Sequence, residues 1–292
     1  HSREQAGRQA GATFDELLLG RPVKFKSSKG ETGSLQAIEI IRTAALAAGF
    51  RSVDFLEEPV AACWHVHHTS DERRLKTLIV DIGGGTTDLA VGMVGGSSLH
   101  PSMERAWGLP QGGTDIDVSL SMKAFMPAFG KNQHDIPNHL FYQASTVHDQ
   151  GRQREFAASH VASYPQPFGD RLARLQKPGA TVRLNRAVER LKIRLSDKQR
   201  ASVRLGYIDN GLTASASRAD LEACSESYCS ELTRLIRQAI AESGTVDVVY
   251  VTGGASRSPF LRTVVQSAAG ASKVIIGEPS LSVIQGLARA TQ

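Results

Sequence analysis

The sequence predicts an α/β protein, and three observations carry this prediction. Two apolar runs joined by a glycine-rich turn within Leu75–Val94 are typical of an antiparallel β-hairpin. Val246–Thr252 is a continuous apolar run, as in strands that are covered on both faces. Apolar residues recur at helical spacing in Leu184–Leu195 and Leu221–Ile240, which indicates long amphipathic helices. Hairpin strands and a strand covered on both faces, combined with long helices, define the α/β class.

Length, charge and cysteine content exclude several functions. The 292 residues suffice for one large domain or two smaller ones, and an apolar content of 41% can form a real core. No apolar run is long enough to predict a membrane span, and no signal segment opens the chain, so we expect no membrane partner. The net charge of +5 is spread along the chain, which argues against nucleic acid as a partner. Three cysteines without metal spacing or an even number favour a reducing, cytoplasmic setting.

The first part of the chain predicts two strands and two helices. In order, we expect a strand at Glu16–Leu19, a polar loop at Ser27–Gly33, a helix capped by Ser34 and ended by Gly49, and a strand at Ser52–Leu56. The stripe of that helix comprises Leu35, Ile38, Ile41, Ala45 and Leu46.

A second helix is predicted to begin in Glu57–Ala62. Pro59 fits a first helical turn, and Glu58 carries the negative charge that a helix N-terminus favours. On these residues alone, an ordinary helix start explains Glu58 better than a functional role does. His65 and His68 share one face of this helix, but no third metal ligand is evident, so we interpret them as surface or partly buried residues.

The turn of the central hairpin carries the strongest chemical signal. Asp81 ends the first strand and Asp88 belongs to the second, and between them lie Gly83, Gly84, Gly85, Thr86 and Thr87. Glycine permits positive φ and close approach of a ligand, and successive amides in such a turn form a nest for anions. Two carboxylates suit a hydrated Mg²⁺. The turn therefore predicts a phosphate and divalent-metal site, with a tight turn and two solvated acids as the alternative.

The rest of the chain alternates strands and helices around a less regular middle part. We expect a third strand near Ser98–Trp107, then a helix opened by Gly112–Asp117 with Ile116, Leu120 and Phe125 inward, and a loop at Gln133–Tyr142. Hairpin strands are expected at Gln199–Leu205 and Leu212–Ala216, followed by a capping box at Ser217–Asp220. Near the end of the sequence we expect a strand at Val274–Ile276 and a closing helix at Pro279–Ala290. Gly286 is expected to permit close helix packing. After the strand at Val246–Thr252, Gly253–Pro259 leads into a helix, which places free amides at a helix N-terminus or forms a standard turn.

Several segments, in this order, resemble DnaK-type chaperones of the actin, sugar-kinase and heat-shock ATPase superfamily. They are EEPVAA at 57–62, DIGGGTTD at 81–88, GGTDID at 112–117, ERLKIRLS at 189–196 and GGASRSP at 253–259. GRPVKF at 20–25 and the segments around the second and last of these look most like the YegD-type branch of DnaK-like chaperones. The resemblance implies an actin-like ATPase fold (ribonuclease H-like), with a mixed sheet flanked by helices and an inserted α+β subdomain. It also implies ATP or ADP with Mg²⁺ as cofactors.

The resemblance assigns phosphate and metal roles to the first segments. Gly83, Gly84, Gly85 and Thr86 would hold the β- and γ-phosphates, and Asp81 would hold Mg²⁺ through water. Glu58 would help to place the attacking water, and Asp88 would support the metal and the turn.

The later segments receive nucleoside roles. Gly112 and Gly113 would approach phosphate and ribose, and Gly253 and Gly254 would lie against the nucleoside. Arg257 would stack on the base. Glu189, Lys192 and Ser196 would contact ribose and adenine, although a solvated charged helix face explains these three equally well. The chain departs from the family pattern at Thr114, Ile193, Ala255 and Ser280.

The resemblance also predicts a domain organisation. Residues 1–74 would be a remnant of lobe I ending in the first connecting helix, residues 75–117 and 217–292 the nucleotide-binding core of lobe II, and residues 118–216 its inserted subdomain. No first phosphate loop precedes Phe14, so we expect an N-terminally truncated ATPase that hydrolyses ATP poorly.

Three functions remain open at this point. The first is the nucleotide-binding part of a DnaK-like chaperone-type ATPase with client or co-chaperone partners. The second is a small-molecule kinase of the same superfamily. The third is a non-catalytic nucleotide-binding scaffold.

Overall fold

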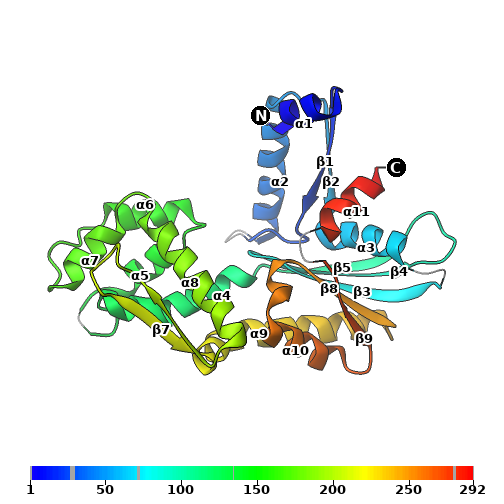
Figure 1. The fold of residues 1–292 in the computed structure, drawn as a ribbon. Coiled ribbons are helices and arrows are strands. Elements are labelled where there is room, and N and C mark those ends of the chain that lie inside the picture. Colours follow the sequence, from blue (N-terminus) through cyan, green and yellow to red (C-terminus); the bar gives the residue numbers. More distant parts are fainter. Residues whose placement is uncertain (1, 27–29, 71–72, 134, 279–280, 292) are drawn as a thin grey trace. The chain divides into compact units, whose positions relative to one another are not determined.

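The computed structural model describes residues 2–26, 30–70, 73–133, 135–278 and 281–291 (Figure 1). The chain divides into two compact units. Unit 1 comprises His1–Gly113 and Ser230–Gln292, and unit 2 comprises Thr114–Cys229. Unit 2 is therefore an insertion in the sequence of unit 1.

The main sheet of unit 1 has five strands in the order β5-β4-β3-β8-β9. Their bounds are β3 Leu75–Ile82, β4 Thr87–Val94, β5 Ser102–Leu109, β8 Val248–Thr252 and β9 Lys273–Ile276. β4 runs antiparallel to both of its neighbours, whereas β3, β8 and β9 are parallel to one another. The sheet is thus mixed, which confirms the predicted fold class.

Helices flank this sheet on both sides (Figure 1). α3 (Glu58–Thr69) and α11 (Ser282–Ala290) lie on one side, and α10 (Pro259–Ala269) lies on the other with the unit 1 part of α9 (Arg218–Ser243). The core beneath α3 consists of buried apolar residues from the helix and from β3 and β4, namely Ala62, Cys63, Val66, Ile79, Ala90 and Val94. Because β3 and β4 are covered on both faces, their sequences are continuous apolar runs.

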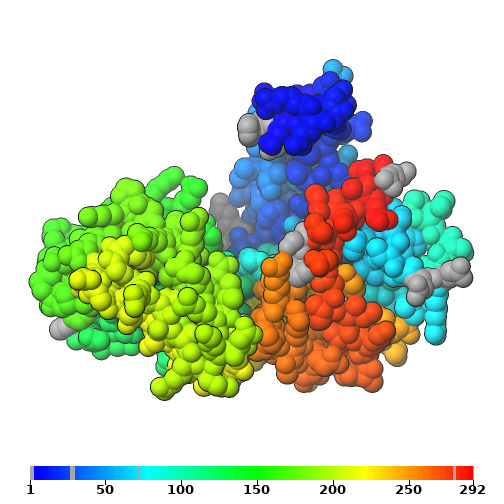
Figure 2. Space-filling model, viewed as in Figure 1, coloured from blue at the N-terminus to red at the C-terminus, as the bar shows by residue number. Residues whose placement is uncertain are grey.

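One of the two edge strands of this sheet, β9, lies at the surface. β9 pairs only with β8 among the described strands. Ile275 and Ile276 are 36% and 37% exposed, and the orange-red segment around them is visible at the surface in Figure 2.

A second, two-stranded sheet precedes the main one in the sequence of unit 1. β1 (Glu16–Arg21) and β2 (Ser52–Glu57) are parallel and are connected by α2 (Gly30–Ala47), while α1 spans Ser2–Ala10. The strand predictions are confirmed, and the leucines of β1 are half-buried.

The prediction for α2 is wrong in its start and in its stripe. The helix begins at Gly30, and the Ser34 hydroxyl accepts a hydrogen bond from the Phe25 amide at 3.2 Å instead of capping the helix. Leu35 and Leu46 are 61% and 46% exposed, and only Ala45 of the expected stripe is buried, because α2 packs on this small sheet along a narrow face.

The histidines of α3 differ in their environments. His65 is half-buried and His68 is exposed, as interpreted from the sequence. His67, which has no predicted role, is buried and bridges backbone groups. The Gly95 amide donates to His67 Nδ1 at 3.0 Å, so Nε2 carries the proton donated to the Ser98 carbonyl at 2.9 Å. His67 therefore fastens the turn that follows β4.

Unit 2 combines helices with one small hairpin. It contains most of α4 (Gly113–Leu120), a π-helical turn at Ser121–Phe125, a 3-10 turn at Met126–Phe129, α5 (Asn138–Ser145), α6 (Gln150–Ala158), α7 (Phe168–Leu175), α8 (Ala180–Asp197), β6 (Arg200–Arg204), β7 (Thr213–Ser217) and the first part of α9. The predicted inward residues Ile116, Leu120 and Phe125 are buried, as are the apolar residues Leu184, Val188, Leu191 and Leu195 of α8. The prediction of a loop over Gln133–Tyr142 is wrong, because α5 begins at Asn138 and buries Leu140 and Phe141.

The capping box at the start of α9 is confirmed. The Asp220 amide donates to the Ser217 hydroxyl at 3.1 Å, and the Ser217 amide donates to Asp220 Oδ2 at 2.9 Å. The closing helix is confirmed from Ser282 onward, whereas Pro279 and Ser280 lie outside the described residues.

Candidate functional site

Two loops meet at the end of the mixed sheet where the neighbouring strands β3 and β8 terminate. β3 and β8 are parallel neighbours, with Asp81 opposite Thr252 at their carboxyl ends. The turn after β3 and the Gly253–Gly254 loop after β8 therefore leave the sheet side by side. Gly253 has φ +88°, and a Cβ there would collide with Asp81 Oδ1 and the Ile82 carbonyl oxygen. The sequence needs glycine at 253 because the two loops touch.

The segment before α4 joins the same turn. The Gly113 amide donates to the Gly83 carbonyl at 3.0 Å. A Cβ on Gly112 would lie 2.7 Å from the Gly83 oxygen and 2.8 Å from the Gly84 oxygen. The structure thus brings together the three glycine segments of unit 1 that the sequence singled out.

The tip of the hairpin turn is bare backbone. The Gly83 amide donates to the Thr86 carbonyl at 2.9 Å and closes the turn. A Cβ built on Gly84 or Gly85 would meet nothing within 4 Å. Glycine permits positive φ, but none of Gly83, Gly84 and Gly85 adopts it. Their contribution is an open backbone surface.

Two carboxylates are buried behind this turn. Asp81 is 6% exposed and Asp88 is 1% exposed, and they face each other across β3 and β4. Burial, followed by repulsion from Glu58 and Asp88, raises the pKa of Asp81 to about 7. Burial also raises the pKa of Asp88 to about 6, although hydrogen bonds from Thr86 and from the Val23 and Lys24 amides oppose the rise. Such a pair favours a bound cation, because a cation offsets the cost of two buried negative charges.

Glu58 stands close to these acids at the start of α3. It is half-buried, and burial raises the pKa of its carboxyl. A Cβ on Gly20, near the end of β1, would lie 3.3 Å from Glu58 Cγ, so glycine leaves room for this side chain. Within the described ranges, no group of three or more His, Cys, Asp or Glu side chains is arranged to hold a metal ion directly.

The loop after β8 exposes the backbone of Gly254 and the side chain of Arg257. Gly254 and Arg257 are exposed, and a Cβ on Gly254 would meet nothing within 4 Å. Ser256 is buried, and its hydroxyl donates to the Gly253 carbonyl at 2.7 Å, which holds the loop in a 3-10 turn over Gly254–Arg257.

The remaining predicted residues belong to unit 2. Glu189 is exposed on α8, and the Ser196 hydroxyl donates to the Lys192 carbonyl at 3.5 Å. Lys192 Nζ lies 2.8 Å from Asp117 Oδ1 and 2.9 Å from Oδ2. Burial raises the pKa of Asp117, and Lys192 opposes that rise. Lys192 thus has a buried ion-pair partner that sequence reasoning did not assign to it.

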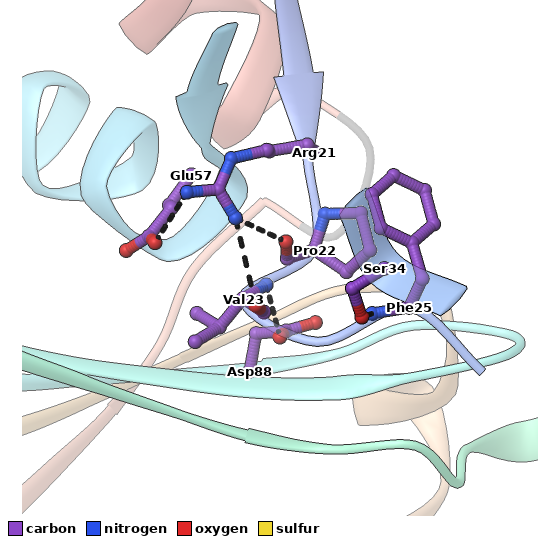
Figure 3. A network of polar contacts seen from close by, with 7 residues as sticks. All are labelled: Arg21, Pro22, Val23, Phe25, Ser34, Glu57 and Asp88. Atoms are coloured by element: carbon purple, nitrogen blue, oxygen red, sulfur yellow. Dashed lines mark hydrogen bonds and ion pairs between the residues drawn. The ribbon is translucent and has the colours of Figure 1, made fainter. Parts of the chain in front are cut away.

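Sequence reasoning also missed the residues that hold Asp88. The Val23 amide, in the loop that follows β1, donates to Asp88 Oδ1 at 2.7 Å (Figure 3). Arg21 donates to Glu57 beside this loop. The GRPVKF segment stands out in the sequence for its resemblance only. Every non-proline residue has a backbone amide, so the sequence does not reveal which amides bind Asp88. These contacts can be identified only from the folded structure.

The fold and this site define the class of protein. A mixed sheet flanked by helices, with a glycine-turn hairpin and a glycine loop at one edge, is consistent with the actin-like ATPase fold of Hsp70 proteins. The family model described as "Hsp70 protein" matches residues 170–283.

Curated relatives agree with this class. The chain is 24% identical over 270 residues to "Chaperone protein DnaK" of Elusimicrobium minutum (strain Pei191), which covers 89% of this chain and 36% of that protein. It is 25% identical over 278 residues to "Chaperone protein dnaK3" of Synechococcus elongatus, covering 91% and 31%. It is 34% identical over 96 residues to "Cell division protein FtsA" of Neisseria meningitidis serogroup B, covering 33% and 22%.

The chain is thus similar to Hsp70 proteins over residues 170–283 and to DnaK chaperones over 89% and 91% of its length. The chain spans about a third of the length of the two chaperone relatives, 36% and 31%. Among the helices in the described part of the chain, none combines the length and the apolar character that crossing a membrane requires.

Proposed function

We propose that this chain binds ATP or ADP together with Mg²⁺, as the nucleotide-binding part of a DnaK-like, chaperone-type ATPase. The observation that carries the proposal is the meeting of three glycine segments with two buried carboxylates at one sheet edge. Exposed backbone amides donate hydrogen bonds to phosphate oxygens, and buried carboxylates attract the divalent ion that accompanies a nucleotide.

The candidate site residues of the hairpin turn have proposed roles with phosphate and metal. The amides of Gly83, Gly84, Gly85 and Thr86 hold the β- and γ-phosphates. Asp81 attracts the hydrated Mg²⁺, and Asp88 supports it and the turn. When bound, Mg²⁺ neutralises charge on the phosphates.

The other glycine segments hold the rest of the nucleotide in this proposal. Gly112 and Gly113 approach phosphate and ribose, and Gly253 and Gly254 lie against the nucleoside. Arg257 stacks on the base. Glu189, Lys192 and Ser196 are proposed to contact ribose and adenine, and the ion pair with Asp117 then fixes the position of Lys192 beforehand.

Hydrolysis is a further proposal that concerns the whole protein. Glu58, with its raised pKa, is suited to orient and deprotonate an attacking water. Phosphoryl transfer also requires charge stabilisation from several sides of the phosphate, so we propose that this chain alone hydrolyses ATP slowly. Client proteins and co-chaperones are proposed partners of the whole protein, because two relatives are named as chaperones.

The proposal includes an assignment of lobes. Residues 1–74 would be part of lobe I and end in the first connecting helix, and residues 75–117 and 217–292 would form the core of lobe II. Residues 118–216 would be a subdomain of lobe II. The separate packing of unit 2 supports a subdomain in this region.

Calorimetry with MgADP on the variant Gly84→Val tests the site. A Cβ at 84 meets nothing within 4 Å, so we expect the fold to be unaffected, while the branched side chain of valine blocks a phosphate. We expect affinity to fall at least about tenfold, or ~1.4 kcal/mol. Gly206→Val is the matched control, because Gly206 is also exposed and without neighbours within 4 Å. Equal MgADP affinity in Gly84→Val and Gly206→Val would reject the phosphate-turn assignment.

Non-catalytic nucleotide binding is the second candidate function. Ile193 is 57% exposed on α8, where the resemblance implies an arginine that packs on the base. Intact MgADP binding without turnover in the whole protein would establish this alternative. Phosphate transfer to a sugar would instead indicate a small-molecule kinase.

A further inference from the structure

A loop from the start of unit 1 reaches the buried carboxylate Asp88. After β1, the chain passes over β4, and the Val23 amide donates to Asp88 Oδ1 at 2.7 Å (Figure 3). The next amide, of Lys24, also hydrogen-bonds to Asp88. Hydrogen bonds from backbone amides to a carboxylate are strong and fix its orientation.

Arg21 holds this loop from its other side. Arg21 Nη2 donates to Glu57 Oε1 at 2.8 Å, and Nη1 donates to the Pro22 carbonyl at 3.0 Å and the Val23 carbonyl at 3.5 Å. The side chains of Arg21 and Glu57 are each 25% exposed, so water competes only partly for these bonds. A planar guanidinium can serve an acid and a backbone oxygen together, because its donors lie in a rigid fork.

The surface beneath the loop is shaped to receive it. Gly108 of β5 is the partner of Asp88 in the strand register. A Cβ at 108 would lie 2.9 Å from the Lys24 amide nitrogen, 3.1 Å from Val23 Cβ and 3.2 Å from Asp88 Oδ1. At the far end of the loop, the Phe25 amide donates to the Ser34 hydroxyl at 3.2 Å. The loop is therefore anchored at both ends and seated on a glycine.

We propose that Arg21, held by Glu57, is a positioning residue of the phosphate and metal site, since it fixes the Pro22–Lys24 backbone so that the Val23 and Lys24 amides orient Asp88. The inference rests on the proposed function of that site. It assigns to Arg21 and Glu57 a role that the motifs of the hairpin do not contain. It also makes the orientation of Asp88 dependent on Val23, which lies 65 positions earlier in the sequence.

The first test measures the loop without nucleotide. In Arg21→Ala, amide exchange of Val23, followed by NMR, should accelerate at least about tenfold, because the loop loses its fork of hydrogen bonds. Arg51→Ala is the matched control, since Arg51 lies in the same unit with a side chain 83% exposed and, within the described part of the chain, forms an ion pair with Asp15 alone. Unchanged Val23 exchange in Arg21→Ala would overturn the inference.

The second test measures MgADP affinity by calorimetry. We expect Arg21→Ala to weaken binding about tenfold, as for loss of one charge-assisted hydrogen bond, and Arg51→Ala to leave it unchanged. In an Asp88→Asn background, Arg21→Ala should cause little further loss, because Arg21 acts through Asp88. Additive losses in the double variant would mean that Arg21 acts elsewhere, and the inference would fail.

The two proposals fail in distinguishable ways. If the unmodified chain does not bind MgADP, the proposed function fails, and Val23 exchange still decides whether Arg21 holds the loop. If the unmodified chain binds and Arg21→Ala binds equally well, the positioning inference alone fails. If Arg21→Ala does not fold, Arg21→Lys replaces it, because lysine keeps the charge but lacks the fork. We expect about a threefold loss for Arg21→Lys, and unchanged affinity there would overturn the inference.

Discussion

Asp81 and Asp88 lie where their charges cost folding free energy. Burial raises the pKa of each carboxyl, and repulsion from Glu58 adds a smaller rise. A carboxyl with a raised pKa binds protons more tightly in the folded chain than in the unfolded one. Its contribution to stability is therefore fully present below pH 3.8, the ordinary value, and is lost as pH rises through about 7 for Asp81.

Asp81→Asn should accordingly stabilise the chain at high pH. Without Mg²⁺ or nucleotide, we expect its free energy of unfolding to exceed that of the unmodified chain by about 1–3 kcal/mol at pH 8, and the difference to vanish near pH 4. Urea unfolding across this pH range measures it. Asp54→Asn, at an exposed acid of β2, is the control and should show no such trend. A destabilised Asp81→Asn at pH 8 would contradict the assigned cost of the buried charge.

Gly253 and Gly254 are neighbours with opposite requirements. Gly253→Ala forces a Cβ into Asp81 and Ile82 at positive φ, so we expect a loss of about 2–4 kcal/mol in unfolding free energy. Gly254→Ala meets nothing and should change stability by less than about 0.5 kcal/mol. Thermal unfolding of both variants provides the comparison. Equal melting temperatures would show that the two loops do not touch as described.

The residue scale also shows the limit of sequence reasoning. The pattern of two acids around three glycines located a turn with bare backbone, but none of Gly83, Gly84 and Gly85 has a positive φ. Positive φ occurs instead at Gly253, where a neighbouring loop leaves no room for a side chain. Such crowding between distant segments has no local signature.

At the scale of elements, the crossing of α3 and α11 is the tightest helix contact that the sequence anticipated. A Cβ on Gly286 of α11 would overlap the backbone of Ala61 in α3. This confirms the expectation that Gly286 permits close packing. Because Glu58 opens α3, the crossing helps to determine where this acid lies.

Gly286→Ala should therefore separate the two helices. We expect a loss of about 2–4 kcal/mol in unfolding free energy, since the added methyl group cannot be accommodated without backbone movement. Gln285→Ala, at an exposed position of the same helix, should be nearly neutral. Denaturant unfolding distinguishes them, and a neutral Gly286→Ala would contradict the close crossing.

Elements with strong periodicity were predictable, and short ones were not. The hairpin β3–β4, α8 and α9 each carry a long apolar pattern or a capping box and were confirmed. α5 was wrongly assigned to a loop because its eight residues hold only a short cluster of apolar side chains. The start of α2 was misplaced because the Ser34 hydroxyl serves the Phe25 amide, a tertiary contact.

At the scale of the whole molecule, the sequence carried the fold class but not its contacts. The mixed sheet and its flanking helices follow from strand and helix patterns. The adjacency of the Gly83 turn and the Gly253 loop follows from the parallel pairing of β3 with β8, which joins residues about 170 positions apart. Only a resemblance to a known fold, and not local periodicity, could anticipate that pairing.

Hydrogen exchange measured by mass spectrometry, with and without MgADP, tests the central claim most directly. The claim is that one nucleotide contacts both loops at the edge of the main sheet. We expect slower exchange in peptides covering Gly83–Asp88 and Gly253–Arg257 together, and no change around Gly206. Slower exchange in only one of the two loops, or in neither, would contradict the proposal.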